Sequence, residues 1–314
     1  MSARRVYAVA ASLVCALAAT FALGTAQAAA FKVGNTYLAL GDSLAYGFHA
    51  KEFKEELALG KVNPETFDQG YVNDFYNLLT LFNPSIKLIN DGCPGETTET
   101  MIHGSGVPGF CAGGPHGTPF PYAYLHHPYE AASQLEDALK ILQKDPDVSP
   151  ITLDIGANDA LQFLAAECGF PKTDSCSEGQ LQGEIQKIGE NTAFILSQLR
   201  HAAPHATIIM VGLYNPFPEV PSEGSDRLTA ALNIAFEKAV QAVPGVSFAN
   251  PMPLFNPSLF LGLPESFDIP VICAFTAMCP GGTYNPASPE ADIHPTNLGY
   301  EVMAGVVAFD FLTH

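Results

Sequence analysis

Four short segments carry residue types that together suit acyl transfer. Ser43 lies in Gly-Asp-Ser-Leu, directly after the first of five predicted strands, and Asn158 lies in Gly-Ala-Asn-Asp, after the third. A Gly-containing turn over residues 90–97 follows the second predicted strand, and His294 stands just before the last helical segment. A serine nucleophile, a histidine base and donors for an oxyanion are what ester cleavage requires. Each segment alone fits an ordinary cap, turn or loop, but their co-occurrence predicts one site.

Five apolar runs predict the strands that must position these residues. Such runs are typical of parallel strands buried on both faces, and they cover residues 37–40, 86–89, 151–155, 207–212 and 246–249. Helical stripes alternate with them and a last helix closes the chain, at residues 135–142, 181–199, 228–243 and 297–312. Ser133 with Glu136, and Thr296, are the expected caps. This order predicts a doubly wound α/β fold, in which ligands bind beyond the carboxyl ends of the strands.

The chain is longer than such a sheet needs, and the excess falls in three inserts. The first insert, near residues 49–70, is charged. The second, near residues 102–129, is rich in Gly, Pro and His, and the third, near residues 251–290, is rich in Pro and Phe. The middle insert carries histidines that suit either metal binding or a solvated loop, namely His103, His126 and His127. The last insert contains segments 253–255 and 259–261, which suit either an acyl pocket or the core. No linker divides the chain, so a single domain is expected over residues 29–314.

The first 28 residues predict an export signal. Arg4 and Arg5 precede an apolar stretch over residues 6–23, and residues 26–28 form an A-x-A cleavage site. A membrane anchor is the alternative, because the apolar stretch is about long enough to span a bilayer. The cleavage site favours a signal peptide over residues 1–28. We therefore expect a secreted, extracellular protein without a stable membrane anchor.

Six cysteines follow the predicted signal peptide. An even number of cysteines in an exported protein predicts three disulfides. The cysteines fall in three local pairs, which favours sequential pairing of Cys93 with Cys111, Cys168 with Cys176, and Cys273 with Cys279. A zinc site is the alternative. It is disfavoured because there is no C-x-x-C pair and no histidine at ligand spacing from these cysteines.

Composition excludes several classes of protein. Of 314 residues, 47% are hydrophobic and 15% are charged, so the chain has ample apolar surface for a core and is not disordered. The 14 Lys and Arg stand against 32 Asp and Glu, which gives a formal net charge of −18. Phosphate contacts need Lys and Arg, so no nucleic-acid partner is expected.

We expect a monomer that acts on a small-molecule or lipid ester.

The four segments resemble the motif blocks of the GDSL or SGNH hydrolases. The first block matches Gly-Asp-Ser-Leu and implies that Ser43 is the nucleophile. The second matches residues 92–97, the third matches Gly-Ala-Asn-Asp, and the fifth matches His294 with the proline after it. The resemblance implies that His294 is the general base. It also implies an oxyanion hole formed by the N–H groups of Ser43 and Gly95 and the side-chain amide of Asn158.

The resemblance covers the whole mature chain in order. It implies a three-layer αβα sandwich around a five-stranded parallel sheet, with a flavodoxin-like order of strands. Among members of the family, the six-cysteine form looks like the bacterial secreted lipases and esterases, in which three disulfides are usual.

One position departs from the D-x-x-H pattern of the family. Ala291 stands where the acid is expected, whereas Asp292 is two residues and Glu290 four residues before His294. Three arrangements remain open. The carboxylate of Asp292 orients His294, a backbone carbonyl near Ala291 does so in a Ser–His dyad, or Glu290 or another acid takes that place.

These residues predict a serine esterase or lipase that works through an acyl-enzyme and requires no metal or organic cofactor. Asp42 and Asp159 are expected to be structural neighbours of the motif residues. The other functions left open are a carbohydrate acetyl esterase and an acyltransferase. A non-catalytic binding module is a further alternative, but it would not need Ser43 and His294.

Overall fold

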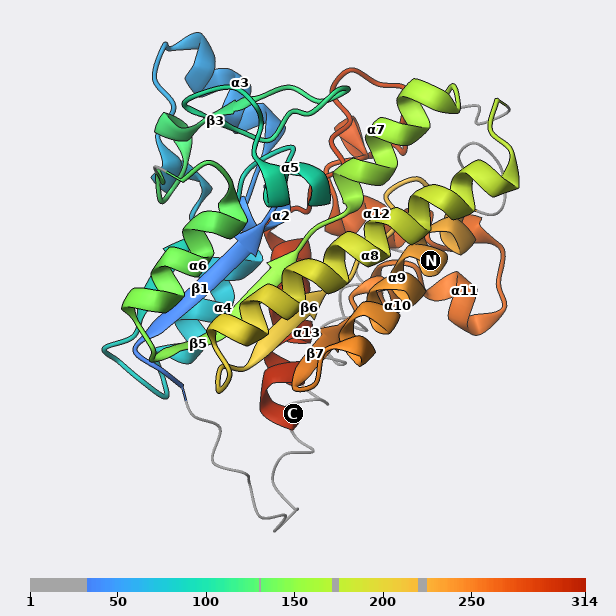
Figure 1. The fold of residues 1–314 in the computed structure, drawn as a ribbon. Helices are drawn as coiled ribbons and strands as arrows, with labels where there is room; N and C mark the ends of the chain where they lie inside the picture. Colours follow the sequence, from blue (N-terminus) through green and yellow to red (C-terminus); the bar gives the residue numbers. More distant parts are fainter. Residues whose placement is uncertain (1–32, 130, 171–174, 220–224) are drawn as a thin grey trace. The chain divides into compact units, whose positions relative to one another are not determined.

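Five parallel strands form the central sheet in the computed structural model of this chain (Figure 1). The structure describes residues 33–129, 131–170, 175–219 and 225–314, and the predicted signal peptide lies outside them. The strands are β1 (Thr36–Gly41), β2 (Lys87–Asn90), β5 (Val148–Asp154), β6 (Ile208–Val211) and β7 (Val246–Ala249). Each lies where an apolar run predicted it, with ends that differ by three residues at most.

The strand order is β2-β1-β5-β6-β7, and every neighbouring pair is parallel. Along the chain, the first crossover leads from β1 to one side of the sheet, and the later crossovers lead to the other side. The order therefore reverses between β1 and β5, and a crevice opens beyond the carboxyl ends of the strands at such a point. The doubly wound, flavodoxin-like topology predicted from the sequence is confirmed.

Helices cover both faces of the sheet and give the predicted three layers (Figure 1). One face packs against α6 (Gln134–Lys144), α8 (Glu178–Ala202) and α9 (Ser225–Ala242). The other packs against α4 (Tyr71–Leu79) and α13 (Asn297–Thr313). Successive residues of β1 enter opposite cores: Leu38 and Leu40 join the first, and Tyr37 and Ala39 join the second. Strand residues point alternately to the two faces, which is why each strand had to be apolar throughout.

The predicted caps begin the helices, with one difference. The Ser133 hydroxyl accepts a hydrogen bond from the Glu136 N–H at 3.2 Å, and the Thr296 hydroxyl accepts one from the Gly299 N–H at 3.2 Å. The Glu136 carboxylate, however, accepts from the N–H of Ala132 rather than of Ser133, so the reciprocal capping box does not form. Helix α4 was not predicted from the sequence. It begins after Gly70 without a side-chain cap, and so lacks the usual signal for a helix start.

The three inserts form short elements around the sheet. The first contains α3 (Ala50–Ala58) and η2 (Pro64–Phe67). The second follows α5 (Thr98–His103) and contains β3 (Phe110–Cys111), β4 (Phe120–Pro121) and η3 (Tyr122–Tyr124). The third contains α10 (Met252–Phe255), α11 (Pro257–Leu261), η4 (Glu265–Phe267), α12 (Ile269–Phe275) and η5 (Pro280–Gly282). The first two inserts share an apolar cluster, in which the Phe53 ring lies 5.6 Å from that of Phe120.

Three disulfides join the cysteines in the predicted sequential pairing, Cys93–Cys111, Cys168–Cys176 and Cys273–Cys279. The first and third bridges close loops within or beside inserts.

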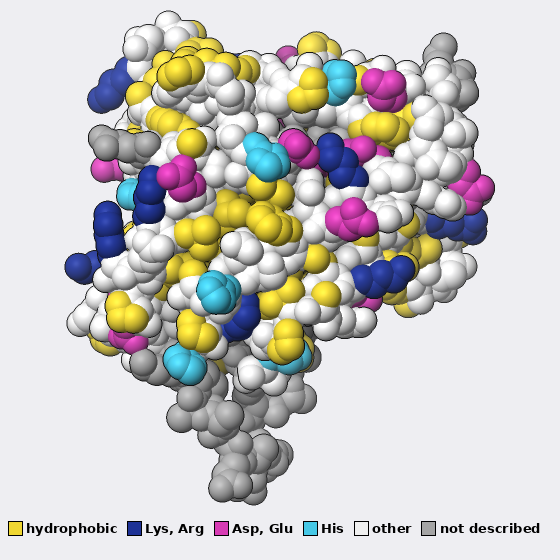
Figure 2. All heavy atoms as spheres, in the orientation of Figure 1, with side chains coloured by type: hydrophobic (Ala, Val, Ile, Leu, Met, Phe, Trp, Pro, Cys, Tyr) yellow, Lys and Arg dark blue, Asp and Glu magenta, His cyan; other side chains and the backbone are white. Residues whose placement is uncertain are grey.

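On the face shown in Figure 2, basic, acidic and apolar side chains lie interspersed. Within the described part of the chain, no helix is long and apolar enough to cross a membrane.

Candidate active site

Ser43 begins the short helix α2 (Ser43–Tyr46), which follows β1 without a linker. The chain turns sharply at Gly41, whose φ is +141°. A Cβ at Gly41 would lie 2.1 Å from the carbonyl oxygen of Asp154, so only glycine fits there. The Asp42 carboxylate accepts a hydrogen bond from the Leu44 N–H at 2.9 Å and caps the helix. The turn therefore holds Ser43 at the carboxyl end of β1.

Two side chains that the sequence analysis missed fix this turn. The Gln134 amide accepts from the N–H of Gly41 at 2.7 Å and donates to its carbonyl at 2.9 Å. Asp154, the last residue of β5, accepts from the Asp42 N–H at 3.2 Å and from the Tyr71 hydroxyl at 2.6 Å. Burial, with the charge of Asp42, raises the pKa of Asp154 well above its usual value. Asp154 could have been singled out from the sequence, because it is an acidic residue at the end of an otherwise apolar strand. Nothing in the sequence around Gln134 indicates its role.

His294, in the loop before α13, connects Ser43 to Asp292. Its Nε2 lies 2.8 Å from the Ser43 Oγ, and its Nδ1 lies 2.5 Å from the Asp292 Oδ1. The other oxygen of Asp292 accepts from the backbone N–H of Ala50 at 2.9 Å. Burial opposes ionisation of Asp292, but the hydrogen bonds from His294 and Ala50 hold its pKa below the usual value. The sequence left three arrangements open for the group at His294 Nδ1. In the structure this group is the Asp292 carboxylate, whereas Glu290 is exposed.

The loop geometry explains how an acid two residues before His294 reaches it. The side chains of Ala291 and Ile293 pack against the apolar cluster that includes α13. Asp292 and His294 alternate with them along the loop, and both take part in the contact with Ser43 described above. The Ile293 carbonyl accepts a hydrogen bond from the Tyr214 hydroxyl at 2.6 Å, and the His294 carbonyl accepts one from the Ala277 N–H at 3.0 Å. The loop is therefore extended and tied to the third insert.

One of the predicted oxyanion donors, Asn158, lines the same cavity as Ser43. Asn158 is in the first turn of α7 (Ala157–Glu167), and its amide nitrogen lies 3.0 Å from the Glu96 carbonyl and 3.2 Å from an Asp42 oxygen. Gly95 has a φ of +87°, a conformation that favours glycine. Among the described residues, the N–H groups of Ser43 and Gly95 donate to no acceptor. Neither of these two N–H groups is therefore engaged within the described part of the chain.

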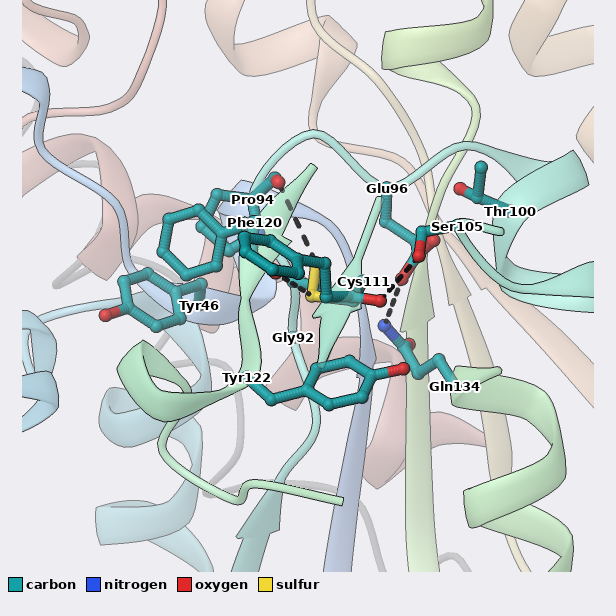
Figure 3. Close-up of a disulfide and its surroundings, with 12 residues drawn as sticks. Tyr46, Gly92, Pro94, Glu96, Thr100, Ser105, Cys111, Phe120, Tyr122 and Gln134 are labelled. Atoms are coloured by element: carbon teal, nitrogen blue, oxygen red, sulfur yellow. Dashed lines mark hydrogen bonds between the residues drawn. A yellow bond between two sulfur atoms is a disulfide. The ribbon is translucent and has the colours of Figure 1, made fainter. Parts of the chain in front are cut away.

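The disulfide Cys93–Cys111 supports the loop that carries Gly95 (Figure 3). On one side of it lies a pair of aromatic rings, Tyr46 and Phe120, with centroids 5.7 Å apart. On the other side, Gln134 donates to the carboxyl group of Glu96 at 3.3 Å. Burial raises the pKa of Glu96 to about 8. Glu96 thus links the loop that carries Gly95 to Gln134, the side chain that fixes the turn at Gly41.

Asp159 is a structural link between two helices, as expected from the sequence. Its carboxylate accepts hydrogen bonds from the backbone N–H of Thr98 at 2.9 Å and from the Thr98 hydroxyl at 2.6 Å. Thr98 begins α5, so the bonds join the start of α5 to the start of α7. These bonds hold Asn158, the neighbour of Asp159, close to the loop that carries Gly95.

A family model described as GDSL-like Lipase/Acylhydrolase matches residues 39–302. The match includes all four motif segments. The chain belongs to this family. It is therefore a carboxylic ester hydrolase, as the resemblance implied.

Solved structures of similar fold include lipases and an esterase. The lipase Lip_vut3 from a goat rumen metagenome is 17% identical, with a TM-score of 0.52 over 88% of this chain and 96% of that chain. A variant of Axe2, a Geobacillus acetyl-xylooligosaccharide esterase, is 14% identical, with a TM-score of 0.52 over 90% and 95%. A putative GDSL-like lipase from Parabacteroides merdae is 14% identical, with a TM-score of 0.52 over 90% and 97%. No curated protein matches the sequence. At these identities, the likeness shows the fold alone.

In this GDSL-family hydrolase, a cavity of about 330 Å³ opens beside Ser43 and His294. Its walls come largely from aliphatic and aromatic side chains, among them Leu161, Leu164, Leu181, Leu213, Phe217, Leu228 and Leu232. The volume lies in the range of small-molecule sites. The Phe-rich segments of the third insert do not line it. Phe255 is buried against Tyr214, with ring centroids 4.4 Å apart, and Phe260 is 53% exposed.

Proposed function

We propose that this chain is a secreted serine esterase that cleaves carboxylic esters with medium-length acyl chains. The observation that carries the proposal is the continuous contact from Ser43 through His294 to Asp292 at the mouth of an apolar cavity. The distance between Ser43 and His294 is within the hydrogen-bond reach that a nucleophile and its base need.

In this mechanism His294 Nε2 takes the hydroxyl proton as the Ser43 oxygen attacks the ester carbonyl carbon. The tetrahedral oxyanion accepts hydrogen bonds from the N–H groups of Ser43 and Gly95 and from the Asn158 amide. The oxyanion takes the place of the 3.2 Å contact between Asn158 and Asp42, which is the longer of the two that the amide makes.

Collapse of this intermediate breaks the bond to the alcohol oxygen, and the leaving alcohol receives the proton held by His294. An ester between the acyl group and Ser43 remains. Water then attacks the carbonyl carbon of that ester while His294 accepts a proton from the water. The bond to the Ser43 oxygen breaks, this oxygen takes the proton back from His294, and the carboxylic acid leaves. Asp292 favours the proton on His294 Nδ1, which leaves Nε2 free to accept in both half-reactions. None of these steps requires a metal or an organic cofactor.

The cavity supports an acyl chain rather than an acetyl group as the occupant. A volume of about 330 Å³ accommodates about ten heavy atoms at roughly 30 Å³ each. Each methylene placed in an apolar site contributes about 0.8 kcal/mol of transfer free energy. Acetyl esters, including those of carbohydrates such as the substrate named for the Geobacillus esterase, would leave the aliphatic walls unfilled. The same residues serve both substrate classes, so chain length is the property to test.

Secretion is part of the proposal and is supported from two sides. Residues 1–28 have the layout of a signal peptide, and three disulfides persist best in an oxidising compartment. We propose that the mature enzyme is an extracellular monomer without a stable membrane anchor or nucleic-acid partner.

A panel of p-nitrophenyl esters from acetyl to palmitoyl tests the proposal. We expect kcat/KM to rise from acetyl to a maximum between hexanoyl and decanoyl, with no change when EDTA is added. The variant Leu228→Trp narrows the cavity and should move the maximum to shorter chains. Leu254→Trp is the matched control, since Leu254 is 40% exposed and does not line the cavity. A maximum at acetyl that neither variant moves would refute an acyl-chain site.

A further inference from the structure

A group of three side chains that can ligate a metal ion, two aspartates and a histidine, lies outside the site described above. Asp91 follows β2, Asp137 is on α6, and His127 is in the middle insert. One ligand atom from each of the three lies within 4.8 Å of the other two. His127 Nδ1 faces both carboxylates, at 2.6 Å from Asp91 Oδ1 and 3.8 Å from Asp137 Oδ2.

The hydrogen bonding of this group is incomplete. Asp91 is fully buried, yet its second oxygen, Oδ2, has no partner among the described residues. Asp137 Oδ2 is also buried without a hydrogen-bond partner in the described part of the chain. A buried carboxylate oxygen that accepts nothing is costly, because it has lost its water and gained no donor. A single proton on His127 Nδ1 satisfies Asp91 Oδ1 and leaves these other oxygens unpaired.

We infer that Asp91, His127 and Asp137 form a structural zinc site. A cation between the three residues replaces the proton of His127 Nδ1, stays in contact with Asp91 and gives Asp137 Oδ2 the partner that it lacks. Zinc accepts one imidazole and two carboxylate ligands, whereas calcium and magnesium prefer oxygen-only sets. Tetrahedral bonds of 2.0–2.1 Å place ligand atoms about 3.3 Å apart, which the present separations of 2.6 and 3.8 Å bracket. The His127 side chain is 40% exposed, so water has access to the remaining coordination position.

The site would fasten the middle insert to the sheet and to α6. His127 is the only one of the three ligands that belongs to the insert. The ion would therefore act on the insert in the same way as Cys93–Cys111, which joins the turn after β2 to β3. Its role is stability, and it takes no part in the ester chemistry at Ser43. Chelation should consequently lower the melting temperature without lowering the rate of the folded enzyme.

The test uses untagged, disulfide-intact mature protein that has been treated with a chelator and then returned to chelator-free buffer. We expect one zinc per chain by calorimetry and elemental analysis. We also expect the melting temperature to rise by about 5–10 °C at a zinc concentration of 100 times Kd. Magnesium at the same concentration should not raise it. An equal shift with magnesium, or the absence of a one-to-one zinc complex, overturns the inference.

Variants locate the site on these residues. Asp137→Asn and His127→Gln should weaken zinc binding at least tenfold, because each removes a ligand. Asp137 accepts no hydrogen bond from the described residues, so its replacement leaves the fold intact even if Asp91→Asn does not fold. Asp68→Asn is the matched control: Asp68 lies 3.4 Å from His126, the neighbouring histidine of the same insert. Zinc binding that is equally weakened in the control, or unchanged in Asp137→Asn and His127→Gln, contradicts the assignment. Ester hydrolysis should be the same in all folded variants, which separates this test from that of the proposed function.

Discussion

Replacing Asp292 by asparagine should lower kcat by about 10⁴, or roughly 5.5 kcal/mol in the activation barrier. The reason is the direction of the hydrogen bonds around the carboxylate. Oδ2 accepts from the Ala50 N–H at 2.9 Å, and Oδ1 accepts from His294 Nδ1 at 2.5 Å and from the His294 N–H at 3.2 Å. An asparagine has one acceptor oxygen and cannot serve both sides.

Of the two backbone N–H groups that donate to Asp292, that of Ala50 is the closer, at 2.9 Å against 3.2 Å for that of His294. We expect this contact to fix the orientation of the asparagine side chain. If its oxygen stays on the Ala50 N–H, its NH₂ group faces His294 Nδ1 and donates to it. The ring proton of His294 then moves to Nε2, which can no longer accept the proton of Ser43. The magnitude of 10⁴ is that of the same tautomer error in the serine-protease triad. Loss of the negative charge also removes the counter-ion for the imidazolium that forms during attack.

Steady-state kinetics with p-nitrophenyl octanoate measure the effect, with folding checked by circular dichroism. Glu290→Gln is the control, because Glu290 is exposed and should be dispensable. If Asp292→Asn keeps kcat within tenfold of the wild-type enzyme, the carboxylate does not set the tautomer of His294. The enzyme would then work as a Ser–His dyad.

Two further changes probe the donors and the buried acid. Asn158→Ala should lower kcat by 10²–10³, about 2.7–4 kcal/mol, with little change in KM, and a loss below fivefold would remove its amide from the oxyanion hole. Glu96 has a pKa raised from 4.5 to about 8 by burial, so between these values the folded protein binds more protons than the unfolded chain. The free energy of unfolding should therefore fall as pH rises through that window, and Glu96→Gln should raise the melting temperature at pH 8.5 but not at pH 5. Glu237→Gln, at an exposed position on α9, should change neither value, and an equal effect of Glu96→Gln at both pH values would contradict the cause.

The sheet was predictable because its strands carry their own signal. Burial on both faces requires apolar residues throughout, and the runs in the sequence therefore coincide with β1, β2, β5, β6 and β7. Helices α6 and α13 were predictable from their stripes and caps, whereas α4 begins after Gly70 and has no cap to mark it. The signal thus lies within each segment, where a periodicity or a cap can be read.

The contacts that complete the site depend on distant segments, and no local pattern predicts them. One oxygen of Asp292 contacts His294. The other accepts a hydrogen bond from the N–H of Ala50, which is 242 residues away in the chain. Gln134 holds the turn at Gly41 across 93 residues, and it lies in none of the motif segments. The apolar cavity comes from α7, α8 and α9 rather than from the Phe-rich insert, because the aromatic rings of that insert pack in the core or face solvent.

Covalent trapping tests the central claim, that Ser43 is the nucleophile, most directly. The mature enzyme is inactivated with a p-nitrophenyl alkylphosphonate, which forms a stable bond to an activated serine, and the peptides are then mapped by mass spectrometry. We predict one adduct per chain, on Ser43, formed in step with the loss of activity and absent from Ser43→Ala. An adduct on another residue, or a Ser43→Ala variant that retains a tenth of the wild-type rate, would contradict the account.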